Sequence, residues 1–330
     1  MQFRKILLSI FAMIFICSNS FAADWVSYKG GEGLGKGKHI VIVTGDDEYR
    51  SEESMPQFGK ILAKRHGFDV DVLFAINSED DSIQPDFQTN IPGLEKLADA
   101  DLMILFTRFR NLPDEQAQPI EDYVNSGKPI IALRTSTHAF NFTDAGSSYT
   151  KWSWNNKEWD GGFGRQVLGE TWINHYGAHK KESTRGLIAK GMESHPIVRG
   201  CEDIWGPSDV YGIKQLTGDS KPIVMGQVLV GMNHDDAPNT DKELVPVAWI
   251  KTYTGSLGVP SRVFTTTMGH GGDFLSEGFR RLVVNAVYWG LGMDNLIPDR
   301  ADVELVGDYN PSPIGFGNYV KGVKPSDHEM

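Results

Sequence analysis

The chain has 330 residues, 40% of them hydrophobic and 11% aromatic, and a formal net charge of −11. A chain of this length and composition can bury a sizeable core. Its acidic balance argues against nucleic acid and anionic membrane surfaces as partners, because both attract surfaces rich in lysine and arginine. The composition therefore indicates a globular protein with neither of those partners.

The first 22 residues have the plan of a secretory signal peptide. Arg4 and Lys5 precede an apolar run over residues 6–16, and small residues precede a cleavage position after Ala22. The run is shorter than the roughly 20 residues that a membrane-spanning helix needs, so an uncleaved anchor is the less favoured alternative. We therefore expect a secreted or periplasmic protein that makes no membrane contact after cleavage.

Cleavage would leave a single cysteine. It removes Arg4, Lys5 and Cys17 and no acidic residue, so the net charge changes from −11 to −13 and Cys201 remains alone. An internal disulfide is then excluded, and the fold must rely on its core. A lone cysteine is more often a small buried hydrophobe than a catalyst.

Short apolar segments alternate with helical segments through the first half of the chain. Strands are predicted at 39–44, 68–74, 102–106 and 129–133 from their branched and aromatic residues. One helix is predicted to end at Gly67, and another to open at Pro113 and end at Gly127. This alternation predicts an α/β fold with a mostly parallel central sheet and right-handed crossovers.

The second half is less regular, but no linker divides residues 23–296, which we interpret as one domain. Residues 146–177 are rich in Trp, Asn and Gly and are predicted to form an ordered insertion. Its tryptophans either pack the insertion onto the domain, which we favour, or stack on sugars. Strands are predicted at 221–230, 245–251 and 261–267, and a helix at about 274–291. The tail, 297–330, is predicted to cross the domain and end loosely.

Three polar turns follow predicted parallel strands, which is where α/β proteins bind ligands. They carry Asp46, Glu48 and Arg50 in the first turn, Arg134 and His138 in the second, and His270 in the third. The second turn holds no cysteine, so the predicted site does not use a thiol. His270 is expected to lie in a site rather than in the core, because its glycine neighbours offer no packing. Imidazole there can serve as acid, base or ligand.

His175 and His179 have the spacing of two residues on one helical face, which suits a metal ion. Gly177 between them, and the absence of a glutamate at position 176, match a zinc-protease helix poorly. Metal binding through this pair alone therefore has little support. The chain also lacks a P-loop, a dinucleotide-binding fingerprint and a G-x-S-x-G motif, so nucleotide binding and serine-hydrolase chemistry have little support either.

Several motifs together resemble the trehalose-utilisation family, the ThuA-like proteins. They are GDDEYRSEESMP (45–56), LPDEQAQPIEDYVNSGKPIIALRTSTHAF (112–140), SHPIVRG (194–200), DVYGI (209–213) and RVFTTTMGHGGDF (262–274). The resemblance covers about residues 38–293. It implies a flavodoxin-like three-layer sandwich similar to class I glutamine amidotransferases, and a role in the metabolism of trehalose, related disaccharides or 3-keto sugars.

By position, the resemblance implies functional roles for His138, His195, Asp209, Tyr211 and His270, although Val210 stands where the family has an acidic residue. We predict His138, His270 and Asp209 as catalytic residues. The predicted substrate-binding residues are Asp46, Glu48, Arg50, Arg134, His179 and Tyr211. No metal ligands are assigned, but a divalent metal between the histidines and a carboxylate is one option.

Two classes of function are compatible with these residues. The favoured one is an exported sugar-processing isomerase, lyase or hydrolase that uses acid/base or metal-assisted chemistry and is not a glutamine amidotransferase. The alternative is a non-catalytic carbohydrate-binding or accessory protein on the same fold. Both predict a small-molecule carbohydrate as partner, and neither predicts an oligomeric state. Convergence of His138, Asp209 and His270 on one place would favour the enzyme.

Overall fold

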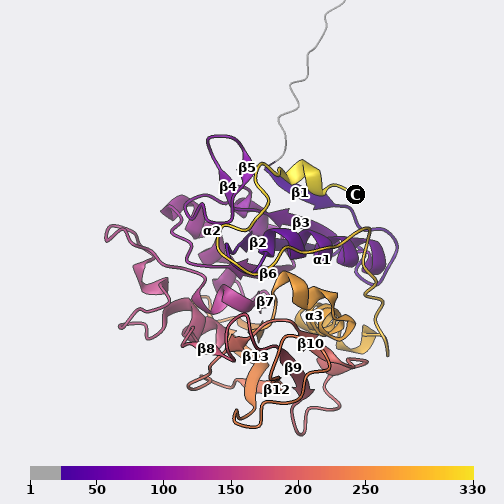
Figure 1. The fold of residues 1–330 in the computed structure, drawn as a ribbon. Coiled ribbons are helices and arrows are strands. Elements are labelled where there is room, and N and C mark those ends of the chain that lie inside the picture. Colours follow the sequence, from indigo (N-terminus) through magenta and orange to yellow (C-terminus); the bar gives the residue numbers. More distant parts are fainter. Residues whose placement is uncertain (1–23) are drawn as a thin grey trace, which may run out of the picture.

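The computed structural model of the protein describes residues 24–330, so the predicted signal peptide lies outside the described residues. A ten-stranded sheet runs through the molecule (Figure 1). In spatial order its strands are β1 (Trp25–Tyr28), β3 (Asp69–Leu73), β2 (His39–Gly45), β6 (Leu102–Thr107), β7 (Ile130–Leu133), β14 (Pro260–Thr266), β13 (Val245–Thr254), β12 (Lys221–Val228), β9 (Thr184–Ile188) and β10 (Ile204–Gly206). Two small sheets pair β4 (Ile76–Asn77) with β5 (Ser82–Ile83), and β8 (His175–Tyr176) with β11 (Val210–Tyr211).

The centre of the large sheet is parallel. β3, β2, β6, β7 and β14 pair side by side in the same direction. β1 at one edge, and β13, β12, β9 and β10 towards the other, pair antiparallel. The four strands predicted in the first half are therefore confirmed as parallel neighbours. The carboxyl ends of all five parallel strands meet at one edge.

Helices lie on both faces of the sheet and complete a mixed α/β architecture. They are α1 (Ser51–His66), α2 (Asp114–Asn125) and α3 (Glu277–Gly290). Residues of α1 and α3 belong to the larger hydrophobic core, and residues of α2 belong to the second. Ile40 and Ile42 of β2 face the first core, and Val41 and Val43 face the second, as the two-residue period of a strand requires. None of the helices within residues 24–330 is long and apolar enough to cross a bilayer.

The Trp-rich segment 146–177 packs against the second core in part only. Trp152 is 4% exposed and stacks on Phe163 with ring centroids 5.4 Å apart. Trp154 and Trp172 are half-buried and contact each other edge to face, with centroids 5.8 Å apart. Trp152 therefore fixes the segment to the domain, whereas Trp154 and Trp172 keep part of their surface open.

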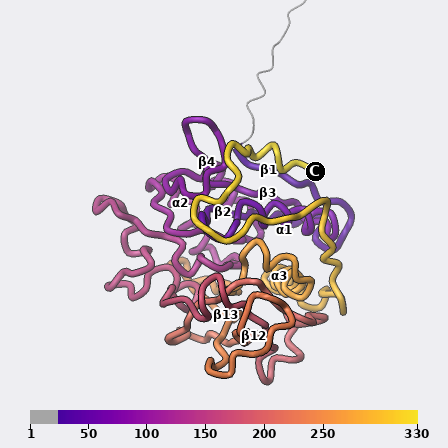
Figure 2. Tube along the Cα trace, in the orientation of Figure 1, coloured from indigo at the N-terminus to yellow at the C-terminus, as the bar shows by residue number. Residues whose placement is uncertain are grey.

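The tail crosses the domain, as predicted, but it does not end loosely. It runs past α1 and ends beside β1 (yellow in Figures 1 and 2). His328 stacks on Phe74 with ring centroids 5.5 Å apart, and its carbonyl oxygen accepts a hydrogen bond from the Tyr28 hydroxyl at 2.9 Å. The expectation of a loose end is therefore wrong, because these contacts hold the last residues in place.

Candidate functional site

Two histidines lie within hydrogen-bonding distance of one aspartate. His175 Nδ1 is 2.6 Å from Asp209 Oδ2, and His179 Nδ1 is 3.0 Å from Asp209 Oδ1. One ligand atom from each of the three residues can be chosen so that all lie within 4.8 Å of one another. The side chain of His175 is 37% exposed and that of His179 is 27% exposed, whereas that of Asp209 is fully buried. These three residues, called the histidine cluster below, are therefore open to solvent on their imidazole side.

A short antiparallel pair of strands builds the histidine cluster. His175 of β8 lies opposite Tyr211 of β11, which places Asp209 just before β11. Gly177 then turns the chain back with a φ of 99°, and a Cβ on it would lie 3.2 Å from the Asp209 Cβ. The four-residue spacing of the histidines thus arises from a strand and a turn, so the helical geometry considered above is wrong. His175 was missed as a site residue for this reason, although its spacing from His179 was the available signal.

Arg134 fixes the position of Asp209. It is fully buried directly after β7, with a left-handed φ of 47°. Its Nη1 donates to the carbonyl oxygens of Asp209 and Thr267, the latter at 2.9 Å, and its Nη2 lies 3.4 Å from Asp209 Oδ1. Burial alone would raise the pKa of Asp209, but the hydrogen bond with His175 and the charge of Arg134 hold that pKa below its ordinary value. The histidine cluster therefore contains an ionised carboxylate.

Glu48 approaches the histidine cluster from the loop after β2. Its Oε1 lies 3.3 Å from His179 Nε2. Burial, and then the charge of Asp46, raises the pKa of Glu48 to about 7. Asp46 Oδ1 accepts hydrogen bonds from the backbone N–H groups of Glu48 and Tyr49 at 2.6 and 2.7 Å. Glu48 is thus a second carboxyl group at the cluster, and Asp46 holds the loop that carries it.

Arg50, also predicted to bind substrate, makes its hydrogen bonds with the backbone. Its Nη2 donates to the carbonyl oxygens of Asp47 and Gly315, both at 2.7 Å. Among the described residues, neither Arg50 nor Asp46 forms a hydrogen bond or ion pair with the histidine cluster. The contacts of both side chains are those of residues that shape a loop.

His138, predicted to be catalytic, is buried beside the histidine cluster. Its ring packs against Phe109, Tyr211 and Trp172, with centroids 5.0, 5.5 and 5.7 Å away. Burial, and then the charge of Arg108, lowers the pKa of His138 well below its ordinary value. His138 is therefore a neutral imidazole packed behind these three rings.

His270, the other predicted catalytic histidine, is only 5% exposed. Its Nδ1 lies 3.3 Å from the Tyr49 carbonyl oxygen, and its backbone N–H donates to Asp273 Oδ2 at 3.0 Å. Burial, and then the charge of Arg134, lowers the pKa of His270 to about 3. The expectation that His270 would avoid the core is wrong, because the Tyr49 loop and not its glycine neighbours supplies the packing.

Arg134 connects these residues. Its guanidinium carbon lies 4.0 Å from the ring centroid of Tyr49 and 4.6 Å from that of Tyr211. The Tyr49 ring contacts that of His270, and the Tyr211 ring contacts that of His138. The predicted catalytic residues are thus linked through one buried centre, but only Asp209 belongs to the histidine cluster.

Other residues that suggested chemistry have structural partners. His195 Nδ1 accepts the backbone N–H of Ile197 at 3.3 Å at the start of a helical turn. Burial raises the pKa of the Cys201 thiol to about 12. Ser136, a hydroxyl in the turn after β7 that could replace the missing thiol as a nucleophile, donates to the Leu105 carbonyl at 2.7 Å. These properties give no support to a nucleophilic role for Cys201 or Ser136.

Comparison with known proteins assigns the family. Residues 39–290 match the family described as ThuA, trehalose utilisation. The chain belongs to the ThuA family. A ThuA-like protein from Parabacteroides merdae ATCC 43184 has a similar structure, with a TM-score of 0.50 and 16% identity over 78% of this chain and 90% of that one. At this identity the likeness shows a shared fold.

A weaker match is Gan42B, a GH42 β-galactosidase from G. stearothermophilus. It has a TM-score of 0.42 and 9% identity over 78% of this chain and 30% of that one. No protein with curated annotation matches the sequence. The histidine cluster and Glu48 fall inside the ThuA match, whereas the tail lies beyond its end at residue 290.

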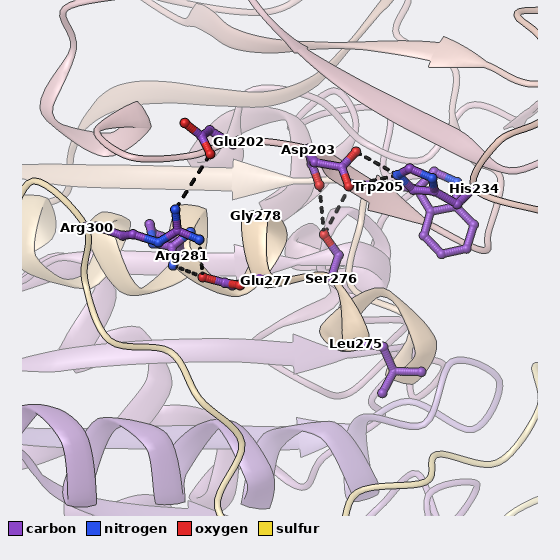
Figure 3. Close-up of a pocket in the computed structure, with 10 residues that line it drawn as sticks. All are labelled: Glu202, Asp203, Trp205, His234, Leu275, Ser276, Glu277, Gly278, Arg281 and Arg300. Carbon is purple, nitrogen blue, oxygen red and sulfur yellow. Dashed lines mark hydrogen bonds and ion pairs between the residues drawn. The ribbon is translucent and has the colours of Figure 1, made fainter.

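The ThuA chain also has a cavity of about 330 Å³ at the start of α3 (Figure 3). It shares no residue with the histidine cluster. Asp203 pairs with His234 at 2.8 Å, and Glu277 pairs with Arg300 at 2.8 Å (Figure 3). Because the charges that line it neutralise one another, this cavity is a weaker candidate than the histidine cluster.

Proposed function

We propose that this ThuA protein is a metal-dependent sugar-processing enzyme whose metal ligands are His175, His179 and Asp209. The observation that carries the proposal is the convergence of two imidazoles and an ionised carboxylate within 4.8 Å. This is a donor set that Zn²⁺, Mn²⁺ and Fe²⁺ accept in catalytic sites that keep an open position. Arg134 supplies the outer contact that such sites use to orient a ligating carboxylate.

The side chains around the cluster suit proton transfer on a sugar. A metal ion bound there would polarise a carbonyl or hydroxyl oxygen of the substrate. Glu48 would take the proton from the carbon beside a keto group and return it to a neighbouring carbon or to a leaving oxygen. Isomerisation or elimination then needs no covalent nucleophile. In this proposal His138, His270 and Tyr211, all of them buried, position the side chains around the site from behind.

Metal dependence is tested with EDTA-treated protein. Zn²⁺ and Mn²⁺ are titrated back by calorimetry, and trehalose and its 3-keto derivative are incubated with each form while products are followed by NMR. We expect turnover only with metal, and a loss of at least about 100-fold in metal affinity in His175→Ala and His179→Ala. His234→Ala, a histidine outside the cluster, is the control. Full turnover after metal removal would overturn the proposal, and saturable shifts without turnover would favour a binding protein.

Glu48→Gln separates the base from the ligands. The substitution keeps the size of the side chain beside His179 and removes its ability to accept a proton. We expect kcat to fall by about 100-fold while metal affinity stays within a few-fold of the wild type. Unchanged kcat would assign proton transfer to another group.

We also propose that the protein acts after export, on the grounds of the leader-like residues 1–22. Intact mass measurement of protein recovered from the periplasm or medium of an expressing bacterium tests this. A mature chain that begins at Ala23 is expected. Retention of residue 1 in the cytoplasm would contradict it.

A further inference from the structure

We infer that the cavity bounded by Trp154 and Trp172 binds a pyranose ring, next to the ring that reacts at the histidine cluster. The inference rests on the proposed function and deepens it, because it assigns the substrate two neighbouring sugar rings. The cavity has a volume of about 380 Å³. That lies at the small end of the range for ligand pockets, about 300–1,000 Å³, and suits one sugar ring rather than a large cofactor.

Two tryptophans form the aromatic part of the wall of this cavity. Trp154 and Trp172 both line it and meet at an interplanar angle of 70°. The remaining surface of these two half-buried rings is left open, unlike that of Trp152, which is buried against Phe163. A flat aromatic face beside polar groups is a surface on which the C–H face of a pyranose can stack while its hydroxyls bond to the rim.

The rim of the cavity offers hydrogen-bonding groups that have no partner within the described part of the chain. Asn155, Lys157 and Lys214 line the cavity, and none of their side chains forms a hydrogen bond with another described residue. Arg165 is different, because it pairs with Glu170 and Asp160, each at 2.7 Å. The rim therefore contains Arg165, whose ion pairs hold it in place, and unpaired amide and ammonium groups. These unpaired groups can donate hydrogen bonds to the hydroxyl groups of a sugar.

Trp172 joins the cavity to the histidine cluster. Its ring centroid lies 6.0 Å from that of His175, edge to face, and 5.7 Å from that of His138. Trp172 therefore contacts the histidine cluster and also lines the cavity. A sugar ring on Trp172 and a second ring at the cluster would be neighbours along one glycosidic linkage.

Trp154→Ala tests the inference, because Trp154 lines the cavity without a ring contact to the cluster. The probes are trehalose and methyl α-glucopyranoside, titrated into EDTA-treated and metal-loaded protein and followed by calorimetry and saturation-transfer NMR. We expect trehalose affinity to fall about tenfold in Trp154→Ala, equivalent to about 1.4 kcal/mol, in both forms. Trp154→Phe should lose less, and metal affinity should not change. Trp159→Ala, in the same segment but outside the cavity, is the matched control.

The outcomes separate this inference from the proposed function. If His175→Ala abolishes metal binding but metal-free protein still binds trehalose through Trp154, the cavity binds sugar whether or not the cluster is a metal site. If Trp154→Ala and Trp159→Ala bind trehalose as tightly as the wild type while metal-dependent turnover persists, the cavity inference is wrong and the proposed function stands. A Trp154→Ala protein that fails to fold leaves the Trp154→Phe comparison and the saturation-transfer contacts to decide.

Discussion

At the scale of single residues, Gly177 allows the segment that carries His175 and His179 to lie close to Asp209. Its backbone adopts a φ of 99°, which side chains other than glycine rarely tolerate, and it faces the Asp209 Cβ directly. Gly191 adopts a similar φ of 86°, but nothing lies within 4 Å of the Cβ it would carry. The two glycines therefore share a backbone cost and differ in what surrounds them.

Gly177→Ala should weaken the histidine cluster as well as the fold. Both Gly177→Ala and Gly191→Ala pay about 1–2 kcal/mol for a left-handed alanine, which thermal unfolding measures. Only Gly177→Ala pushes Asp209 away from His175 and His179, so only this variant should lose about tenfold or more in Zn²⁺ affinity by calorimetry. Equal Zn²⁺ affinity in the two variants would show that the cluster tolerates the shift.

At the scale of elements, the tail stabilises the loop that carries Glu48. The backbone N–H of Gly315 donates to the Glu48 carbonyl at 3.0 Å, and the Gly315 carbonyl accepts from Arg50 at 2.7 Å. The Tyr309 hydroxyl donates to the Gly271 carbonyl at 2.7 Å. A segment outside the family match thus braces two of the three turns at the carboxyl edge of the sheet.

Truncation after Asp308 should loosen this edge without unfolding the domain. Ile297, Ala301 and Val303, which are buried in the larger core, are retained. Residues 309–330 make eight hydrogen bonds with the rest of the chain. Their loss at about 1 kcal/mol each corresponds to a drop in Tm on the order of 10–20 °C. Circular dichroism should stay native while proteolysis of residues 46–53 accelerates. Unchanged Tm and protease resistance would mean that the tail is only a cover.

The elements also show how far the sequence could lead. The apolar patterns of the regular strands predicted which strand ends meet at one edge of the sheet. They therefore predicted that Glu48, Arg134 and His138 lie near one another. The cluster itself needed β8 and β11, which are two residues long and have no periodicity to read. Asp209 was found by resemblance and His179 by spacing, but only the strand pairing brings His175 to them. Asp46 and Arg50 sit in the right loop. The hydrogen bonds of Asp46 with the N–H groups of Glu48 and Tyr49 are local, as is usual for an aspartate in a turn. The bond of Arg50 with the Gly315 carbonyl joins distant parts of the chain, which no local pattern encodes.

At the scale of the whole molecule, buried ionisable groups of both kinds set the pH dependence of stability. Burial lowers the pKa of His66, and lowers the pKa of His270 to about 3 and that of His328 to about 4. Burial raises the pKa of Glu52 to about 8 and that of Asp273 to about 6. These three histidines are thus neutral in the folded protein near neutral pH, and these two carboxyl groups keep their protons to a higher pH than exposed carboxyl groups do.

The signs of these shifts predict a stability maximum near pH 6.5. Below about 6.5 the unfolded chain takes up protons on three histidines that the folded chain leaves neutral, so stability falls with falling pH. The two carboxyl groups oppose this effect above about pH 4, because only the unfolded chain ionises them, but they are fewer than the histidines. Above about 6.5 the histidines are neutral in both states, and ionisation of Glu52 in the unfolded chain makes stability fall with rising pH up to about 8. Thermal unfolding from pH 4 to 9 should show Tm falling on both sides.

Two substitutions identify the groups that make Tm fall on each side of the maximum. Glu52→Gln should raise Tm at pH 8 by about 2 °C or more and leave Tm nearly unchanged at pH 4, where Glu52 holds its proton in both the folded and the unfolded chain. His328→Phe, which keeps a ring stacked on Phe74, should flatten the fall below pH 6. If both variants keep the wild-type profile, other groups control the pH dependence.

The pairing of β7 with β14 has a consequence for when the proposed metal ion could bind. These adjacent parallel strands are separated in the chain by residues 134–259, which include the whole histidine cluster. Such distant pairings form late in folding, because the entropy cost of closing a long loop comes before any stabilising contact between the strands. Arg134 and Thr267, which follow the two strands, meet only after that closure, and Arg134 then holds Asp209 in place. Folding would therefore precede metal uptake, and a chain exported unfolded would take its metal from the compartment it enters.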